Sequence, residues 1–444
     1  MRGEVTTDSQ KVVSGTVFVA LKGRRFDGHD FLAQAVRRGA ACLIVHRRPR
    51  VSRLKQATVI QVRDTLRALG DMAHYCRKLV GPKVLAITGS NGKTTTKEMV
   101  AAILERATIK GERLRGKVLK TEGNFNNLVG LPLTLLRLRG GERAAVLELG
   151  TSQPGEIRRL TEIADPDIGL ITSVAPAHLS GLGSLAGVAR EKGELFRRMH
   201  SRGVAVVNMD DPWVRRLARA FKGGKITYGE RGEVKAESPQ SRGARGMEFT
   251  LRIGRRRQRV QMRFCGRHNV ANAVAAAAMA RVIGADLKAI RAGLAAARPF
   301  AMRMVLEKWR GITVINDAYN ANPASMEAAL RTLAETGASS RKIAVLGDML
   351  ELGRGSAGRH RELGRQAACC DIDRLYLLGK EAGRVRAGAL SAGMDSDRVT
   401  IGKSHRHIAR LLRRELQGGD WLLCKGSRGM KMEKVLEALR ETGD

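Results

Sequence analysis

The sequence contains one short segment whose residue types suit phosphate chemistry, TGSNGKTT at residues 88–95. Its glycines allow backbone amides to approach phosphate oxygens, and a helix that starts directly after them adds positive potential. Lys93 can reach the terminal phosphates of a nucleotide, and Thr94 can offer its hydroxyl to Mg²⁺. The spacing is shorter than the general G-x-x-x-x-G-K-[ST] pattern, because Ile87 occupies the place of the first glycine. The segment predicts a nucleoside triphosphate site, against the alternative of a glycine turn with a surface lysine.

Three other side chains could take part in such chemistry. Glu148 ends the apolar run AAVLELG, a strand that should lie beside the strand of the loop, and a carboxylate there can hold Mg²⁺. His178 follows another strand end, where a histidine on its own is more often structural. Lys192, in VAREKGELF, is on its own typical of a solvated helix lysine. The local patterns leave both readings of His178 and Lys192 open.

Length and composition limit the class of protein. A chain of 444 residues predicts about three domains. No apolar run reaches the roughly 20 residues that cross a bilayer, and the start, MRGEVTTDSQ, is not a signal peptide. The six cysteines have no metal-ligand spacing, which favours free thiols in a reducing compartment. We therefore expect a cytoplasmic protein without a membrane span.

The net charge of +37 raises the question of a nucleic-acid partner. Aromatic residues make up only 4% of the chain, so stacking platforms for bases are scarce, and the basic residues are spread along the whole sequence. We expect no nucleic-acid partner, but an arginine-rich solvated surface whose field steers a polyanionic substrate.

The elements that must position these residues alternate between strands and helices. In the first 80 residues, 17–21 is a predicted strand and 31–39 a predicted helix, and Gly81-Pro82 suits a domain junction. The next predicted strands cover 84–88, 144–150, 167–174 and 204–208, followed by an antiparallel appendage at 229–264. A third set covers 312–317, 342–348, 374–379 and 421–427. Such alternation predicts parallel sheets covered on both faces, with ligands at the carboxyl ends of the strands.

Together, these segments resemble the Mur ligase family over nearly the whole chain. The matching motifs are TTDSQKVVSGTVFVALKGRRFDGHDF in the first domain, TGSNGKTTTKE, TEGNFNNLVGLPLTLL, ELGTSQPGEI, APAHLSGLGSLAGVAREKGELF and GRHNVANA in the second, and NDAYNANPASM, VLGDMLELG and KGSRGMKME in the third. GNFNN, NDAYNANP and GDMLELG favour the family branch that adds a dipeptide, and the DNPR-type signature of a sibling is absent. The chain begins shortly before TTDS, which suggests that a first helix or strand is lacking.

The resemblance implies an α/β fold of three domains. Residues 1–81 would form a UDP-substrate-binding domain, 82–298 a central P-loop parallel-sheet ATP-binding domain, and 299–444 a mobile Rossmann-like C-terminal domain. It implies an ATP-dependent amide ligase that joins D-alanyl-D-alanine to UDP-N-acetylmuramoyl-tripeptide through an acyl phosphate, for peptidoglycan precursors. The enzyme would be a monomer, and the third residue of the accepted peptide, diaminopimelate or lysine, stays open.

The resemblance also assigns roles to individual residues. Lys93, Lys192, His178 and Arg303 would be catalytic. The ATP contacts would be Gly89, Ser90, Asn91, Gly92, Lys93, Thr94, Thr95, His268, Asn269, Asn272, Arg303 and Asp317. Two Mg²⁺ ions would be held by Thr94, Glu148, His178 and Lys192, with Lys192 carbamylated by CO₂. The other substrates would meet Thr7, Asp8, Ser9, Asn126, Asn127, Tyr319 and Asn320.

Three alternatives remain. A folylpolyglutamate synthase would be expected to lack the first domain and the GNFNN and NDAYNANP segments. A regulatory P-loop GTPase would need an NKxD guanine reader, and NMDD at 208–211 lacks the lysine. A nucleic-acid-binding protein is motivated by charge alone.

Overall fold

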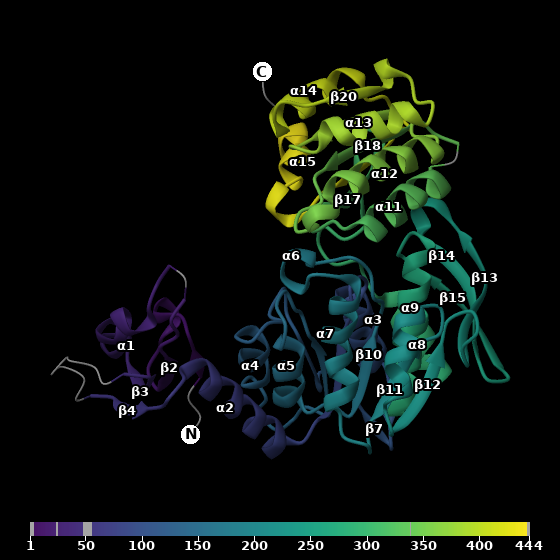
Figure 1. The fold of residues 1–444 in the computed structure, drawn as a ribbon. Helices are drawn as coiled ribbons and strands as arrows, with labels where there is room; N and C mark the ends of the chain where they lie inside the picture. Colours follow the sequence, from purple (N-terminus) through teal and green to yellow (C-terminus); the bar gives the residue numbers. More distant parts are fainter. Residues whose placement is uncertain (1–3, 24, 48–55, 338, 442–444) are drawn as a thin grey trace.

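The chain folds into three α/β units that follow one another along the sequence, each with its own sheet (Figure 1). The computed structural model describes residues 4–23, 25–47, 56–337 and 339–441. The first unit lies beside the second, and helix α2 (Thr65–Val80) runs from one to the other. The three-domain α/β architecture expected from the sequence is confirmed, while boundaries at residues 81 and 298 stay predictions.

The first unit is a four-stranded parallel sheet in the order β1-β2-β3-β4. Its elements are β1 (Val5–Thr6), β2 (Thr16–Val19), α1 (Leu32–Arg37), β3 (Ala40–Val45) and β4 (Thr58–Gln61). Asp64 caps the start of α2 by accepting the amides of Leu66 and Arg67, and Gly81 ends that helix in the left-handed region at φ +71°. The breaker expected at this position is therefore a helix cap.

The central unit is a nine-stranded sheet in the order β15-β14-β13-β12-β11-β10-β5-β9-β8. The strands are β5 (Lys83–Thr88), β8 (Val118–Lys120), β9 (Ala144–Glu148), β10 (Ile168–Ile171), β11 (Val204–Asn208), β12 (Gly224–Tyr228), β13 (Val234–Ser241), β14 (Met247–Ile253) and β15 (Arg256–Met262). Strands β13–β15 pair antiparallel, as expected. They do not form a separate appendage, because Tyr228 pairs in parallel with Val234 and joins them to the main sheet.

Helices cover both faces of this sheet because its strands are apolar on both sides. In β5, Leu85 and Ile87 face a core shared with α3 (Lys93–Leu104), α9 (Arg267–Ile283) and α10 (Leu287–Ala296). Val84 and Ala86 face the opposite core, which helices α4 (Gly130–Leu135), α5 (Glu156–Ala164), α7 (Leu185–Arg198) and α8 (Pro212–Arg219) share. Helix α6 (Leu179–Leu182) and the small hairpin β6–β7 (Thr108–Ile109, Glu112–Arg113) complete the unit. Across the described residues, no helix combines the length and apolarity that crossing a bilayer requires.

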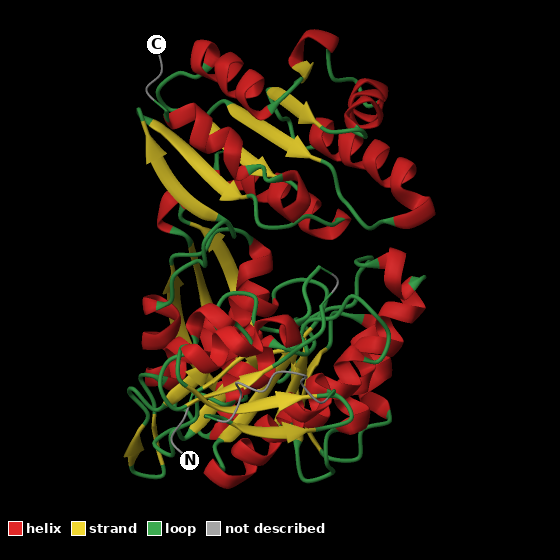
Figure 2. Cartoon of the chain, turned by 90° about the vertical axis from the view of Figure 1, so that its left-hand side faces the viewer, coloured by secondary structure: helices red, strands yellow, loops and turns green. Residues whose placement is uncertain are grey.

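The third unit is a six-stranded sheet between two helical layers (Figure 2). Its order is β16-β17-β21-β18-β19-β20, and only β16 runs antiparallel to its neighbour among the described strands. The elements are β16 (Val305–Trp309), β17 (Ile312–Asp317), α11 (Pro323–Thr336), β18 (Lys342–Gly347), α12 (Ser356–Cys369), β19 (Arg374–Leu378), α13 (Ala382–Ser391), β20 (Val399–Ile401), α14 (His405–Glu415), β21 (Trp421–Lys425) and α15 (Glu433–Arg440).

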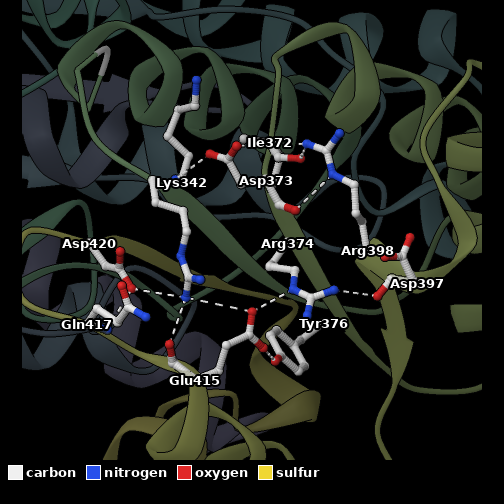
Figure 3. A network of polar contacts seen from close by, with 11 residues as sticks. Lys342, Ile372, Asp373, Arg374, Tyr376, Asp397, Arg398, Glu415, Gln417 and Asp420 are labelled. Atoms are coloured by element: carbon white, nitrogen blue, oxygen red, sulfur yellow. Dashed lines mark hydrogen bonds and ion pairs between the residues drawn. The ribbon is translucent and has the colours of Figure 1, made fainter.

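A polar network joins the amino ends of the strands in this unit to the end of α14 (Figure 3). The Glu415 carboxylate accepts hydrogen bonds from Arg374 Nε and from the Tyr376 hydroxyl, while Arg341 donates to the Glu415 carbonyl at 2.8 Å. Arg341 also donates to Asp420 at 3.2 Å. These bonds tie the amino ends of the strands together and leave the carboxyl ends, on the opposite side of the sheet, free to build a site.

Candidate active site

A cavity of about 550 Å³ lies between the central and C-terminal units, with walls from both. It sits at the carboxyl ends of β5 and β10 on one side and of β17 and β21 on the other. Fourteen of the predicted site residues line it: Ser90, Asn91, Gly92, Lys93, Thr94, Thr95, His178, His268, Asn269, Asn272, Arg303, Asp317, Tyr319 and Asn320. The fold thus brings together residues that are more than 200 positions apart in the sequence.

The glycine loop is fixed from both sides by neighbouring side chains. A Cβ on Gly89 would lie 1.8 Å from Thr172 Oγ1, and one on Gly92 would lie 2.2 Å from Asn272 Oδ1. Both glycines also have positive φ, +145° and +80°, which L side chains rarely adopt. The Thr172 hydroxyl donates to the carbonyl of Asn91 at 2.5 Å. The loop is therefore a rigid turn that presents its amides at the start of α3.

Lys93 is the first residue of α3 and folds back over the loop. Its Nζ donates to the Gly89 carbonyl at 2.7 Å. Burial lowers the pKa of Lys93, an effect that the Glu148 carboxylate opposes and Arg303 reinforces. The ammonium thus lies at the mouth of an anion-binding loop, in surroundings that favour an added negative charge.

Glu148 lies beside the loop, as expected from its strand end. In the parallel pair β5–β9 it is the partner of Ile87, and it is 2% exposed. Its carboxylate accepts the Thr94 hydroxyl at 2.8 Å and the Asn126 amide at 2.9 Å. Within the described part of the chain, no three His, Cys, Asp or Glu side chains form a metal-binding group. One carboxylate and one hydroxyl nevertheless fit Mg²⁺, which fills its other positions with water and phosphate oxygens.

Lys192 is buried, so the reading of it as a solvated helix lysine is wrong. It is 2% exposed and belongs to the buried stripe of α7, together with Val188, Leu195 and Phe196. This i, i+3, i+4 spacing was a signal in the sequence that could have located it. Burial, and secondarily the charge of Lys93, lower the pKa of Lys192 well below its usual value. Among the described residues, its ammonium has no hydrogen-bond or ion-pair partner.

His178 connects the central unit to the C-terminal unit. It has a left-handed backbone at φ +53° just before α6, and its Nδ1 lies 2.6 Å from Glu351 Oε2. Burial lowers the pKa of His178, while its contact with Glu351 raises it and the charges of Lys93 and Lys192 lower it. His178, Lys93 and Lys192 therefore form one electrostatic group.

The far end of the cavity is built from α9 and the C-terminal unit. Burial lowers the pKa of His268 to about 4, so the ring is neutral at pH 7. Asn272 donates to Asn269 Oδ1 at 3.0 Å. The Arg303 guanidinium lies 4.0 Å from the centre of the Tyr319 ring, and its Nε is buried without a hydrogen-bond partner. A donor held in this way suits an anionic ligand.

Three residues that line the cavity, Lys425, Asn322 and Glu351, were not predicted from the sequence. Lys425 donates to the Asp317 carboxylate and, at 3.0 Å, to the Asn320 carbonyl. Asn322 Nδ2 donates to Asn91 Oδ1 at 2.7 Å, which links α11 to the glycine loop. Lys425 is the last residue of β21 and lies within the strand predicted at 421–427, so the rule that ligands gather at strand ends could have found it.

The residues predicted to meet the other substrates lie apart from this cavity, except Tyr319 and Asn320. Asp8 accepts the Gln10 amide, and Ser9 donates to Gln34 at 2.9 Å, so both stabilise the first unit. Asn127 accepts the amides of Val129 at 3.1 Å and Gly130 at 2.8 Å, directly before and at the first residue of α4. Their substrate role, and that of Thr7, stays a prediction.

The fold and the cavity define a nucleotide-dependent enzyme whose site is divided between two domains. Three family models match the chain: the Mur ligase family, catalytic domain, over residues 3–77, the Mur ligase middle domain over 87–280, and the Mur ligase, glutamate ligase domain over 302–428. The chain belongs to the Mur ligase family, as its motifs indicate, and is an ATP-dependent ligase.

Individual relatives match over almost the full length. The chain is 38% identical to the UDP-N-acetylmuramoyl-tripeptide–D-alanyl-D-alanine ligase of Escherichia coli, covering 99% of this chain and 94% of that one. MurF from Acinetobacter baumannii has a similar crystal structure, with a TM-score of 0.90 and 34% identity over 99% of this chain and 93% of that one. A MurF ligase from Thermotoga maritima in complex with ADP has a TM-score of 0.86 and 28% identity, covering 98% and 97%.

A structure that bears on the main alternative is more distant. A folylpolyglutamate synthase from Mycobacterium tuberculosis in complex with ADP is 19% identical, with a TM-score of 0.66 over 85% of this chain and 94% of that one. At this identity the likeness establishes a shared fold only.

Proposed function

We infer that this chain adds D-alanyl-D-alanine to UDP-N-acetylmuramoyl-tripeptide at the expense of ATP, in the synthesis of peptidoglycan precursors. The observation that carries this conclusion is the full-length match, at 38% identity, to a ligase named for these substrates. Residues 3–77, in the first unit, match a Mur ligase family model. This unit would bind the uridine nucleotide, in addition to the two domains that form the cavity. The ATP and UDP substrates and the six free cysteines support a cytoplasmic location, and we propose a monomer.

The reaction begins with transfer of the γ-phosphoryl group of ATP to the terminal carboxylate of the tripeptide. The loop amides and Lys93 hold the triphosphate, and Arg303 supplies positive charge from the opposite wall of the cavity. Gly89, Ser90, Asn91, Gly92, Thr94 and Thr95 form the phosphate cradle. The amine of D-alanyl-D-alanine then attacks the acyl phosphate, forms the amide bond and releases phosphate.

The adenosine end of ATP is assigned to the wall built by α9 and the C-terminal unit. His268, Asn269 and Asn272 would contact the adenine, and Asp317 the ribose hydroxyls. Tyr319 and Asn320 lie on the wall where the third substrate would approach, and Thr7, Asp8, Ser9, Asn126 and Asn127 would contact the uridine nucleotide. The third residue of the peptide is left open between diaminopimelate and lysine.

Two Mg²⁺ ions complete the proposed site. Thr94 and Glu148 would hold the first. His178, which lines the cavity, and Lys192, whose charge acts on His178, would hold the second. When bound, these ions would neutralise the charge of the transferring phosphoryl group.

Carbamylation of Lys192 would turn a buried cation into an anionic ligand. The neutral amine forms a C–N bond with CO₂ and releases a proton to solvent, so the low pKa of Lys192 favours the reaction. A nearby cation, Lys93, favours the anionic product in turn.

A phosphate-release assay tests this function. With ATP, Mg²⁺ and UDP-N-acetylmuramoyl-tripeptide, phosphate should appear only after D-alanyl-D-alanine is added. Tripeptides ending in diaminopimelate or lysine, tested separately, identify the accepted third residue. Equal turnover with glutamate and a folate would overturn the assignment in favour of a folylpolyglutamate synthase.

A further inference from the structure

Glu351 makes a contact between domains that the proposed reaction does not yet use. It lies just after β18, and its carboxylate meets His178 Nδ1 at 2.6 Å across the domain boundary. The backbones meet as well, because the Ser180 amide donates to the Glu351 carbonyl at 3.3 Å. A residue 173 positions away in the sequence thus reaches a proposed metal ligand only when the two domains are together.

We propose that Glu351 is a positioning residue that orients His178 for the reaction when the C-terminal domain closes. This inference rests on the proposed function. Closure of the C-terminal domain would then have two effects. It would bring the two halves of the nucleotide site together, and it would orient the His178 imidazole.

The chemistry of the pair fixes the protonation of the ring. An ionised carboxylate can only accept hydrogen bonds, so His178 Nδ1 must carry the proton in this contact. In the neutral ring Nε2 then carries the lone pair, and His178 lines the cavity. Carboxylates that accept from the second nitrogen of a metal-binding histidine fix its tautomer and ring orientation in this way.

The backbone at both ends of the contact argues against an incidental surface ion pair. His178 and Glu351 both have left-handed conformations, with φ of +53° and +63°. For residues other than glycine, such conformations are strained and persist only where the surrounding structure holds them. Their side chains are 31% and 54% exposed, and an ion pair so exposed to solvent contributes little to stability. The contact does not offset the cost of its own backbone, which points to function.

The loop that carries Glu351 is held in place by its neighbours. The Leu350 amide donates to Ser427 Oγ at 2.8 Å, and the Met349 amide donates to His360 Nε2 at 2.9 Å. Asp348 accepts the amide of Lys380 at 2.8 Å. These bonds anchor the loop to the segment after β21, to α12 and to the segment before α13, so the C-terminal domain itself holds the Glu351 carboxylate in place.

Three variants test the proposal. Glu351→Ala removes the acceptor, and Glu351→Gln keeps an acceptor oxygen without the charge. Glu362→Ala is the control, because it removes an exposed glutamate of the same domain that pairs with Arg365 at 3.0 Å.

Thermal unfolding confirms that each variant folds. kcat and the KM for ATP are measured by phosphate release. Imidazole ¹⁵N NMR with ADP added reports the tautomer of His178, whose signals are assigned among the nine histidines with His178→Gln.

For Glu351→Ala we expect kcat to fall by about 10–100-fold, the range for second-layer ligand partners, with the KM for ATP unchanged within twofold. Glu351→Gln should recover most of the activity, and Glu362→Ala should match the wild type. In the NMR spectra, Nδ1 of His178 should give the signal of a protonated nitrogen in the wild type, Glu351→Gln and Glu362→Ala. In Glu351→Ala it should give the averaged signal of a proton that exchanges between Nδ1 and Nε2.

A Glu351→Ala enzyme with wild-type kcat, or with kcat and KM altered together, would overturn the proposal, as would an unchanged His178 tautomer. Failure of the proposed function looks different. In that case the wild-type enzyme shows no phosphate release that depends on D-alanyl-D-alanine, while the NMR comparison still tests the contact.

Discussion

Replacing Lys192 with alanine should abolish most of the activity while the protein stays folded. The proposed carbamate would supply negative charge at the site, and alanine cannot form one. Because Lys192 is 2% exposed, two opposing contributions determine the effect of the substitution on folding.

The first contribution is lost apolar burial. Alanine lacks the three methylene groups beyond Cβ, which are worth about 0.8 kcal/mol each, or roughly 2–3 kcal/mol together. The second is relief from burying a polar amino group, whose burial strongly lowers the pKa of Lys192. Since the two oppose each other, we expect the free energy of unfolding to change by no more than about 2 kcal/mol. The loss of a preorganised charge should instead lower kcat by about 10²–10³, or 3–4 kcal/mol.

The assay is phosphate release with and without a short carboxylic acid such as acetate or formate. The acid can enter the space that the side chain vacates and restore part of the activity of Lys192→Ala. Arg190→Ala is the matched control, because Arg190 lies on the exposed face of the same helix. It should keep wild-type activity and show no response to acid.

Two results would refute the reasoning. One is a Lys192→Ala enzyme with ordinary activity. The other is a folded, inactive variant that a small amine restores and no small acid does, since this would show that the missing group is a cation.

Three other predictions follow from the same structure. Lys93→Ala should lower kcat by about 10²–10³ through loss of the cation at the transferring phosphate, and acetate should not restore it; near-normal turnover would reduce the glycine loop to a structural turn. Burial lowers the pKa of His268 from 6.5 to about 4, so between these pH values the unfolded chain binds a proton that the folded chain does not. The free energy of unfolding should therefore fall by up to about 3 kcal/mol as the pH drops from 6.5 to 4, and urea unfolding of His268→Gln should show a correspondingly flatter profile. Glu415→Ala deprives Arg374 and Tyr376 of their acceptor and should destabilise the C-terminal unit by about 1–3 kcal/mol in urea unfolding, whereas Glu362→Ala should not.

The sequence predicted the local parts of the site because they depend on local chemistry. A strand, a glycine turn and a helix fix the loop from residue 84 to residue 104, and Glu148 follows from the strand beside it. Family motifs placed His268, Arg303 and Asp317 around the same ligand, and all three line the cavity.

What could not be predicted depends on tertiary contacts over long sequence separations. Asn322 and Asn91 are 231 residues apart, and nothing in either segment indicates the other. Glu351 is a further example, since its motif favours a family branch but says nothing of His178. Lys192 differs, because the burial of its helix face could have been worked out from the spacing of its apolar neighbours.

The close approach of two side chains to the glycine loop has a consequence for how such chains vary in evolution. Asn272 fills the space beside Gly92, and Thr172 fills the space beside Gly89. A smaller residue at 172 or 272 would open room for a Cβ but would not remove the backbone strain at positive φ. We therefore expect the glycines to stay invariant across related chains, and positions 172 and 272 to accept only residues as small as these two or smaller. In an alignment of the family, glycine at 89 should therefore occur together with a small residue at 172, and glycine at 92 together with a small residue at 272.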